Sequence, residues 1–561
     1  MVASNGAIDW YAPESIEGSP ACFSLVDERA GGEIRLGPTR PDWTGNQSTS
    51  DNEAAIVTTT FETPDGAFEL VDHLVDGRIV RVLTVLRGTA EVRLDVVPGE
   101  SFGAPRKVER WSNGVAYGSI RVEGTEPGTV ASLRAGQRLL VTVTTQRDHG
   151  VTRLGPDRSH LTVGEAIEER ARLRGESRSD LGNVEFEGPH RSAVLRSVRA
   201  LRLLTIGKVS IQRALTTSLP ARTGNERNVD ERFAWTRDNA QAVVLWERLG
   251  RRDWADEQRR WLHDRADDDL PFSPVYCSDG DRPHSEGETT HLGWHGNGPV
   301  RVGAPSQLDI GAIAELSMVL DDRHSWPRLV RLGDWLASQA LTPDNGRWDE
   351  RSRPRQHVES ILAVKAALAA LVATAKRRNA LDPVIFDWVD ALNRVDRWLE
   401  AEGRFGRNET AGWRRVGGGL EDDSSDAALL RWIADNAPPS LNEDSEHEAR
   451  HRARVTLDQS VAQLSEGAFA YRHLPHVDDG FPPGQGADLW ASFTMVSALA
   501  IAQRWEEAHS RMDALLTAMG PTHIGATHVD PITGDLRGNL LAAPTHLALI
   551  DAALALDRGP R

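Results

Sequence analysis

The sequence predicts a two-part fold, in which an antiparallel β-sandwich is followed by a larger all-helical domain. Three observations lead to this prediction: alternating apolar residues before residue 185, helical periodicity after it, and a length too great for one compact core. With 561 residues and a hydrophobic content of 39%, the chain has enough apolar material for at least two domains.

Four segments in the first part of the chain alternate between apolar and polar residues, as half-buried strands do. They read AIVTTTFET, RIVRVLTVLRG, EVRLDVVPG and QRLLVTVTTQ, and all fall within residues 55–146. Turn signals such as PDG and GTA separate them, at spacings typical of hairpins. We therefore expect a β-sandwich over residues 1–185, with its strands joined by short loops.

Helical spacing begins with the face formed by Val194, Leu195, Val198, Leu201 and Leu204. Further Ala- and Leu-rich stretches predict helices at 240–250, 309–320, 328–340, 359–376, 384–400, 425–436, 490–504 and 544–556. We assign residues 186–222 to a linker helix and connection, and residues 223–561 to the helical domain. The long polar loops at 270–307 and 403–424 are of a length that is usually functional or disordered.

Composition argues against several classes of partner. The formal net charge of −17, without a basic and aromatic run, argues against nucleic acid. Two cysteines outside any Cys/His cluster suggest neither a zinc site nor a disulfide framework, and we expect no cofactor. No apolar run is long enough to span a membrane, and MVASNGAIDWY lacks the features of a signal peptide, so we expect a cytoplasmic protein. A homo-oligomer remains open.

Several motifs resemble one family along nearly the whole chain. They are NERNVDERFAWTRDNAQAVVLWERLG at 225–250, HLGWHGNGPVRVG at 291–303, GRWDERSRPR at 346–355, DGFPPGQGADLWASF at 479–493 and VDPITGDLRGNLLAAPTHLALIDAALAL at 529–556. Together they are similar to glycoside hydrolase family 15, the glucoamylase, glucodextranase and bacterial trehalase group. The resemblance implies an amino-terminal β-sandwich and a carboxy-terminal (α/α)6 barrel whose loops build one pocket for a sugar or a pyran-like small molecule.

The family's chemistry uses two carboxyl groups, one to protonate the leaving oxygen and one to activate water. The resemblance places Asp349 at the position of the acid, where the family has Glu. It places Thr527, with His528 beside it, at the position of the base, which is also Glu in the family. Shortening the acid by one methylene can cost on the order of 10²-fold. No Glu lies between residues 508 and 561, so His528 and Asp530 are the alternative bases.

The sugar-binding apparatus of the family is largely matched. An Arg and an Asp offer a donor fork and acceptors to adjacent hydroxyl groups, and a Trp face covers the apolar side of a pyranose. One family arginine is replaced by Gly298, which predicts a remodelled outer pocket. The residues expected to bind substrate are Trp235, Arg237, Asp238, Trp294, Arg301, Trp348, Glu350 and Asp488.

Some of these residues have alternative interpretations. Asp488 is either a new acid near the barrel mouth or a helix N-cap, and an N-cap is the preferred interpretation of Asp426. Glu350 binds an outer hydroxyl or forms a salt bridge with Arg351 and Arg353. The histidines at 291, 295, 357 and 528 follow no metal-ligand spacing, so no metal site is expected.

Three functions are compatible with these residues. The first is an α-glucoside or trehalose hydrolase with Asp349 as the acid and an unconventional base. The second is acid-promoted cyclisation, rearrangement or elimination on a pyran-like or acetal-bearing metabolite, which needs no activated water. The third is a non-catalytic carbohydrate-binding protein. Because the base position holds Thr527 while an acid is retained, the sequence alone favours the second function.

Overall fold

A computed structural model of the protein divides into two compact units. Unit 1 comprises Met1–Asn183, Ala221–Thr223 and Thr289–Val300, and unit 2 comprises Val184–Pro220, Gly224–Glu288 and Arg301–Arg561. The structure describes residues 1–49, 56–75, 77–99, 108–145, 161–207, 213–223, 229–266, 273–293, 299–304, 307–320, 322–379, 384–405, 411–418, 424–434, 443–482 and 484–559.

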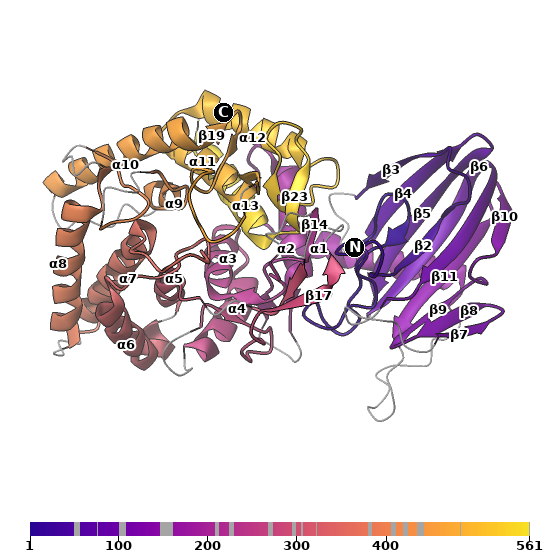
Figure 1. Ribbon diagram of the computed structural model, residues 1–561, viewed down its shortest axis with the longest axis horizontal. Helices are drawn as coiled ribbons and strands as arrows, with labels where there is room; N and C mark the ends of the chain where they lie inside the picture. The colour runs from indigo at the N-terminus through magenta and orange to yellow at the C-terminus, as the bar shows by residue number, and fades with distance from the viewer. Residues whose placement is uncertain are drawn as a thin grey trace. The chain divides into compact units, whose positions relative to one another are not determined.

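Unit 1 is built on antiparallel strands, as the alternating patterns predicted (Figure 1). Its core lies between two layers and includes Ile34 and Leu94 from one layer and Phe68 and Val141 from the other. The elements before residue 183 are β1 (Ala7–Ile8), β2 (Glu33–Pro38), β3 (Thr44–Ser48), β4 (Ile56–Thr63), β5 (Gly66–Val75), β6 (Arg78–Val97), β7 (Val108–Trp111), β8 (Gly114–Tyr117), β9 (Ile120–Glu123), β10 (Val130–Arg134), β11 (Arg138–Thr145) and α1 (Val163–Gly182).

Strand β6 corrects one expectation. The GTA signal at 88–90 does not form a turn, because β6 runs through it for 20 residues. Its first half pairs with β5 and β11, and its second half pairs with β2 and β10. The two halves meet close to a register shift in the pairing of β6 with β5. Gly88, at this point, has φ +66°, and a Cβ on this residue would lie 2.1 Å from the carbonyl oxygen of Asp65.

Unit 2 is a barrel of helices, and twelve of them lie in the described part of the chain. Helices α3, α5, α7, α9, α11 and α13 contact one another in sequence, and α13 closes the ring on α3 (Figure 1). The bounds are α2 (Arg191–Leu204), α3 (Thr236–Arg248), α4 (Arg252–Arg265), α5 (Ile310–Val319), α6 (Asp322–Gln339), α7 (Val358–Arg377), α8 (Val384–Glu402), α9 (Leu429–Ala434), α10 (Glu443–Leu464), α11 (Leu489–Ile501), α12 (Trp505–Ala518) and α13 (Ala543–Leu556).

The inner helices are apolar on nearly every side because the outer helices cover them. In α5, α11 and α13 almost every residue is buried. The expectation that no apolar run reaches the length of a membrane span is wrong for α7, which among the described residues is the one helix long and apolar enough to cross a membrane. Within the protein, 72% of its apolar window is buried. This pattern is typical of an inner helix in a helical domain.

Short strands accompany the helices. Strands β23, β22, β21, β20 and β19 pair in that order, and Asp488 of β21 lies opposite His528 of β22. The remaining bounds are β12 (Thr205–Ile206), β13 (Ala214–Leu215), β14 (Ala221–Thr223), β15 (Ala234–Trp235), β16 (Val275–Tyr276), β17 (Gly287–Gly293), β18 (Pro299–Val302), β19 (Ser465–Glu466), β20 (Phe469–Ala470), β21 (Ala487–Asp488), β22 (Ala526–Val529) and β23 (Leu536–Leu540).

Candidate active site

The residues predicted to bind sugar at the start of α3 are held by hydrogen bonds from neighbouring elements. Arg237 forms an ion pair with Asp309, which caps α5 by accepting a hydrogen bond from the backbone N–H of Ala312 at 2.9 Å. Oδ2 of Asp238 accepts a hydrogen bond from Thr217 at 2.6 Å, and Trp235 is the N-cap residue of α3. Arg237 keeps part of its surface exposed, whereas Trp235 and Asp238 are buried.

Asp349 lies in a turn between α6 and α7 and remains partly exposed. Its backbone has φ +52°, a left-handed conformation that Asp adopts more readily than most residues. The turn is fixed to α5 by Asp344, which accepts hydrogen bonds from the backbone N–H groups of Ile310 and Gly346. Oδ2 of Asp349 lies 3.1 Å from the guanidinium of Arg351. Burial raises the pKa of Asp349 to about 7 although Arg351 opposes this.

Trp348 is held in a defined orientation next to Asp349. Its indole N–H donates a hydrogen bond to Oδ1 of Asp426 at 2.7 Å, and its ring meets that of Trp490 edge-on at 5.4 Å. The guanidinium of Arg472 lies 5.0 Å from the centre of the Trp348 ring. Asp426 also accepts a hydrogen bond from the backbone N–H of Ala428, in the turn immediately before α9 begins at Leu429.

Asp488, His528 and Thr527 form a buried chain of polar contacts. Asp488 caps α11 through the N–H of Ala491 and forms an ion pair with Arg472 at 2.7 Å. Nε2 of His528 is 3.4 Å from Oδ2 of Asp488, and its Nδ1 is 2.9 Å from the hydroxyl of Thr527. That hydroxyl accepts a hydrogen bond from the N–H of Asn539. All three predicted residues are therefore buried and have polar contacts within the protein.

Glu350 differs from its predicted placement. The side chain is 1% exposed, and its Oε1 forms an ion pair with Arg415 at 3.0 Å rather than with Arg351. Burial raises the pKa of Glu350 to about 7 against the effect of Arg415. Successive side chains in this turn point in different directions, so Asp349 faces the partly exposed side while Glu350 faces the interior. A buried ion pair of this kind does not reach a sugar hydroxyl.

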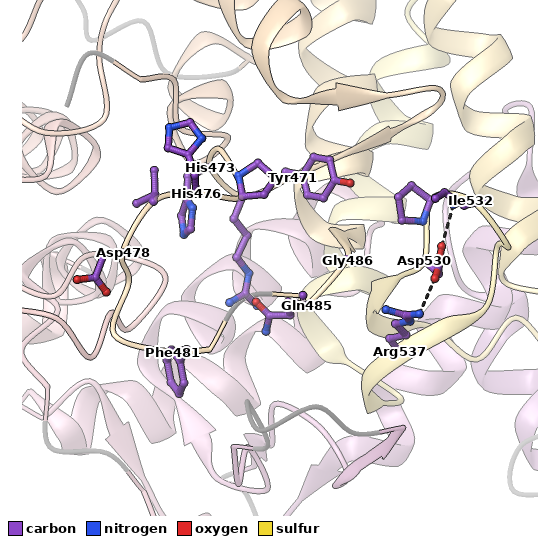
Figure 2. Close-up of a pocket in the computed structure, with 15 residues that line it drawn as sticks. Tyr471, His473, His476, Asp478, Phe481, Gln485, Gly486, Asp530, Ile532 and Arg537 are labelled. Atoms are coloured by element: carbon purple, nitrogen blue, oxygen red, sulfur yellow. Dashed lines mark hydrogen bonds and ion pairs between the residues drawn. The ribbon is translucent and has the colours of Figure 1, made fainter. Parts of the chain in front are cut away.

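A pocket of about 580 Å³ lies beside these residues, between the loop at 471–486 and the hairpin joining β22 to β23 (Figure 2). Figure 2 shows Tyr471, His476 and Phe481 on the first side and Ile532 on the second. Apolar faces next to charged groups suit a sugar ring or a similar small molecule. Arg472 lines this pocket and also contacts Asp488, so the pocket adjoins the buried chain.

Of the predicted residues, Arg301 lies near Phe481 of this pocket and Asp530 lines it. The guanidinium of Arg301 is 5.9 Å from the centre of the Phe481 ring, and that of Arg351 is 5.4 Å away. Asp530 accepts hydrogen bonds from the N–H groups of Ile532 and Thr533 and pairs with Arg537. These backbone hydrogen bonds lower the pKa of Asp530, which makes it a weaker base. Trp294 lies outside the described residues.

A charged layer underlies the tryptophans. Arg347 and Arg431 both form ion pairs with Glu315, at 3.2 and 2.7 Å, and the guanidinium of Arg347 lies 4.0 Å from the centre of the Trp490 ring. Glu359 accepts a hydrogen bond from Trp432, and burial raises its pKa to about 7. Within the described ranges, no group of three or more His, Cys, Asp or Glu residues is arranged to hold a metal ion.

Four residues that the motifs did not predict lie in the site. Arg351 and Glu286 surround Asp349, Arg472 joins Trp348 to Asp488, and Glu231 lies close to Asp238 and Asp488. Glu231 belongs to the same NERNVDERFAWTRD motif as Trp235 and Arg237. The signal in the sequence was its spacing. Glu231 lies two residues before Phe233 and four before Trp235, and alternate residues of an extended segment point to the same side.

Carboxyl groups, arginines and tryptophans at the amino-terminal ends of a closed ring of inner helices define a carbohydrate-active (α/α)6 barrel. The chain belongs to glycosyl hydrolases family 15, whose sequence pattern matches residues 188–518, more than half of the chain. This confirms the family suggested by the motifs.

Relatives that align with nearly the whole chain have low sequence identity to it. A trehalase of Mycolicibacterium smegmatis is 25% identical over 100% of this chain and 89% of that protein. A trehalase of Thermoplasma acidophilum is 23% identical over 99% of this chain and 98% of that protein. The crystal structure of a bacterial glucoamylase complexed with acarbose superposes with a TM-score of 0.65 at 11% identity, covering 99% of this chain and 91% of that chain. This similarity confirms the β-domain followed by a helical barrel.

Proposed function

We propose that the protein hydrolyses an α-glucosidic bond, with trehalose and short α-glucosides as the substrates to test first, and that Asp349 is the general acid. The observation that carries this proposal is a partly exposed carboxyl group whose pKa is raised to about 7, next to Trp348. A carboxyl group with such a pKa is about half protonated at neutral pH, and its protonated form can donate a proton to the leaving oxygen.

The surroundings of Asp349 suit a pyranose. Trp348 offers an aromatic face whose orientation Asp426 fixes, and Arg237 offers hydrogen-bond donors whose position Asp309 fixes. The adjoining pocket has room for the rest of a disaccharide. These features support binding of a sugar with its scissile bond near Asp349.

Family membership and the trehalase relatives support hydrolysis over the acid-promoted cyclisation favoured by the sequence alone. Nothing in the described residues specifically favours ring closure, rearrangement or elimination. We further propose that Asp349 acts at the family's acid position with a shorter side chain.

The test is incubation with trehalose, maltose, isomaltose and α-glucosyl fluoride, with release of glucose and fluoride as the measurements. We expect turnover of at least one glucoside. Because the family chemistry inverts the anomeric centre, α-glucosyl fluoride should give β-glucose first in NMR spectra, and trehalose should give one β-glucose and one α-glucose. Absence of turnover on all four substrates would refute the proposal.

The matched variants are Asp349→Asn and Asp513→Asn, the second at an exposed carboxylate on α12. Asp349→Asn is expected to lose on the order of 10²- to 10⁴-fold on the disaccharides. It should lose far less on α-glucosyl fluoride, because fluoride leaves without a proton. Asp513→Asn should behave as the wild-type protein does. Equal losses on both classes of substrate would remove Asp349 as the acid.

A further inference from the structure

Hydrolysis by inversion needs a second carboxylate, and Glu231 is placed by its backbone near the predicted base position. Residues 231–233 run antiparallel to 217–218, since the N–H of Ser218 donates to the carbonyl of Glu231 at 2.9 Å and the N–H of Thr217 donates to that of Phe233 at 2.8 Å. Asp230 and Arg232 pair with each other and are buried, so the alternating Glu231 side chain points to the other side.

Asn539 connects this segment to the hairpin that carries Thr527. Its side-chain amide donates to the carbonyl groups of Leu219 and Val229, at 3.2 and 2.9 Å, while its backbone N–H donates to the hydroxyl of Thr527 at 3.0 Å. Glu231 follows Val229 by two residues and interacts electrostatically with Asp488, whose Oδ2 lies 3.4 Å from Nε2 of His528. The sequence motif around Thr527 lacks a Glu, and another segment supplies one.

The charged neighbours of Glu231 belong to the same site. Ser218 donates to its Oε2 at 3.4 Å, and Asp238, Asp488 and Arg472 interact with it electrostatically. Asp349 instead interacts with Arg351, Glu286, Arg237 and Asp309. The two carboxyl groups therefore have different neighbours. Arg237, which interacts with Asp349, and Asp238, which interacts with Glu231, are adjacent in the chain. Burial raises the pKa of Glu231 to about 7, so a large fraction is ionised at neutral pH.

Other groups near Thr527 are less suited to remove a proton from water. Asp488 is 2% exposed, and its two oxygens accept from Ala491 and Arg472. His528 is also 2% exposed and lies between Thr527 and Asp488. Asp530 is held in its turn by two backbone N–H groups and Arg537. Glu231 is partly exposed, and its Oε2 accepts a long hydrogen bond from the hydroxyl of Ser218 at 3.4 Å.

We propose that Glu231 is the general base, a role that rests on the hydrolytic function proposed above. Water attacks the anomeric carbon from the face opposite the leaving oxygen and gives one proton to the Glu231 carboxylate. The bond from the anomeric carbon to the glycosidic oxygen breaks, its electron pair stays on that oxygen, and Asp349 supplies the proton. Glu231 ends protonated and Asp349 ionised, and exchange with solvent restores both.

The experiment compares Glu231→Gln, Glu231→Asp and Glu231→Ala with the wild-type protein on a disaccharide and on α-glucosyl fluoride. The control is Glu187→Gln, at a carboxylate with 79% side-chain exposure, which should match the wild-type protein. Glu231→Gln is expected to lose at least 10²-fold on both substrates, on the order expected of a general base. Glu231→Asp should retain part of the activity, and thermal midpoints will identify any variant that fails to fold.

Azide supplies an independent readout, because an anionic nucleophile needs no base. Added azide should restore turnover of α-glucosyl fluoride by Glu231→Ala and give the β-glucosyl azide. Turnover of the fluoride by folded Glu231→Gln within about threefold of wild type would overturn Glu231 as the base while leaving hydrolysis intact. An inactive wild-type protein would instead refute the hydrolytic function itself. If Glu231→Gln misfolds, failure of azide to rescue Glu231→Ala overturns the proposal.

Discussion

The guanidinium of Arg351 lies 3.1 Å from Oδ2 of Asp349 and 3.2 Å from Oε1 of Glu286. Gln307 accepts a further hydrogen bond from Arg351 at 2.6 Å, so this cation is held in place between two carboxylates. Its charge stabilises the ionised form of Asp349 and so limits the increase in pKa that burial causes.

Replacing Arg351 by Gln is therefore expected to raise the pKa of Asp349 above about 7. Since the acid acts in its protonated form, the alkaline limb of the pH profile of kcat/KM should move to higher pH. Activity at pH 8 relative to pH 6 should rise several-fold. Arg353→Gln is the control at an exposed arginine of the same loop, and an unchanged profile in Arg351→Gln would contradict the assignment.

The wild-type profile on a disaccharide should be a narrow bell centred near pH 7. Above about pH 7 Asp349 ionises and cannot donate a proton, and below about pH 7 Glu231 is protonated and cannot accept one. With α-glucosyl fluoride the alkaline limb should disappear and the acidic limb should remain. A plateau from about pH 5 to about pH 9 on the disaccharide would be inconsistent with this pair.

The ion pair of Glu350 with Arg415 predicts an effect on stability. Glu350→Gln removes an ion-pair partner of the fully buried Arg415 and should lower the free energy of unfolding by about 3–5 kcal/mol. Adding Arg415→Met should recover much of that loss in a double-mutant cycle measured by urea denaturation. Where the protein stays folded, KM should be unchanged. A rise in KM without loss of stability would restore Glu350 as a substrate-binding residue.

Asp426 should act on catalysis through the orientation of Trp348. Asp426→Ala removes the acceptor of the indole N–H and of the Ala428 N–H, and we expect roughly a tenfold rise in KM with a smaller change in kcat. Asp426→Asn keeps an acceptor oxygen and should stay within about threefold of wild type. Equal KM values for the two variants would show that the indole needs no such support.

Thr527 has a structural role, although it aligns with the position of the family's catalytic base. Thr527→Val leaves the buried N–H of Asn539 without its acceptor and should cost about 1–3 kcal/mol of unfolding free energy. Thr517→Val, at an exposed position of α12, should change it by less than about 0.5 kcal/mol. Similar urea midpoints for the two variants would contradict this role.

The sequence predicted the order of the two domains because the hydrophobic period changes from two to 3.6 near residue 185. It also predicted most helices, although the segment expected at 425–436 becomes helical only at Leu429, after the turn at Asp426. The continuity of β6 through residues 88–90 was missed, since Gly88 and its neighbours have the local chemistry of a turn. Pairing with β10 on the far side keeps the strand extended.

At the site, the motifs correctly brought Trp348 and Asp349 beside each other, because they are adjacent in the chain. The motifs did not predict which way the Glu350 side chain points, because its orientation depends on Arg415, a residue 65 positions away. Glu231 was missed for the same reason: Asn539 connects Val229, two residues before Glu231, with the hairpin that carries Thr527, and these segments are more than 300 residues apart in the chain. Contacts of this kind are not encoded in local periodicity.

Strand β6 determines how the amino-terminal unit must fold. The last residues of β6 pair with β2, so Val97 meets Glu33 only after the intervening chain has closed into a loop. The first half of the same strand holds β5 and β11, and neither layer can be completed without it. Pairings between such distant residues slow folding. A chain nicked near Gly88 should therefore lose both layers in one cooperative unfolding transition.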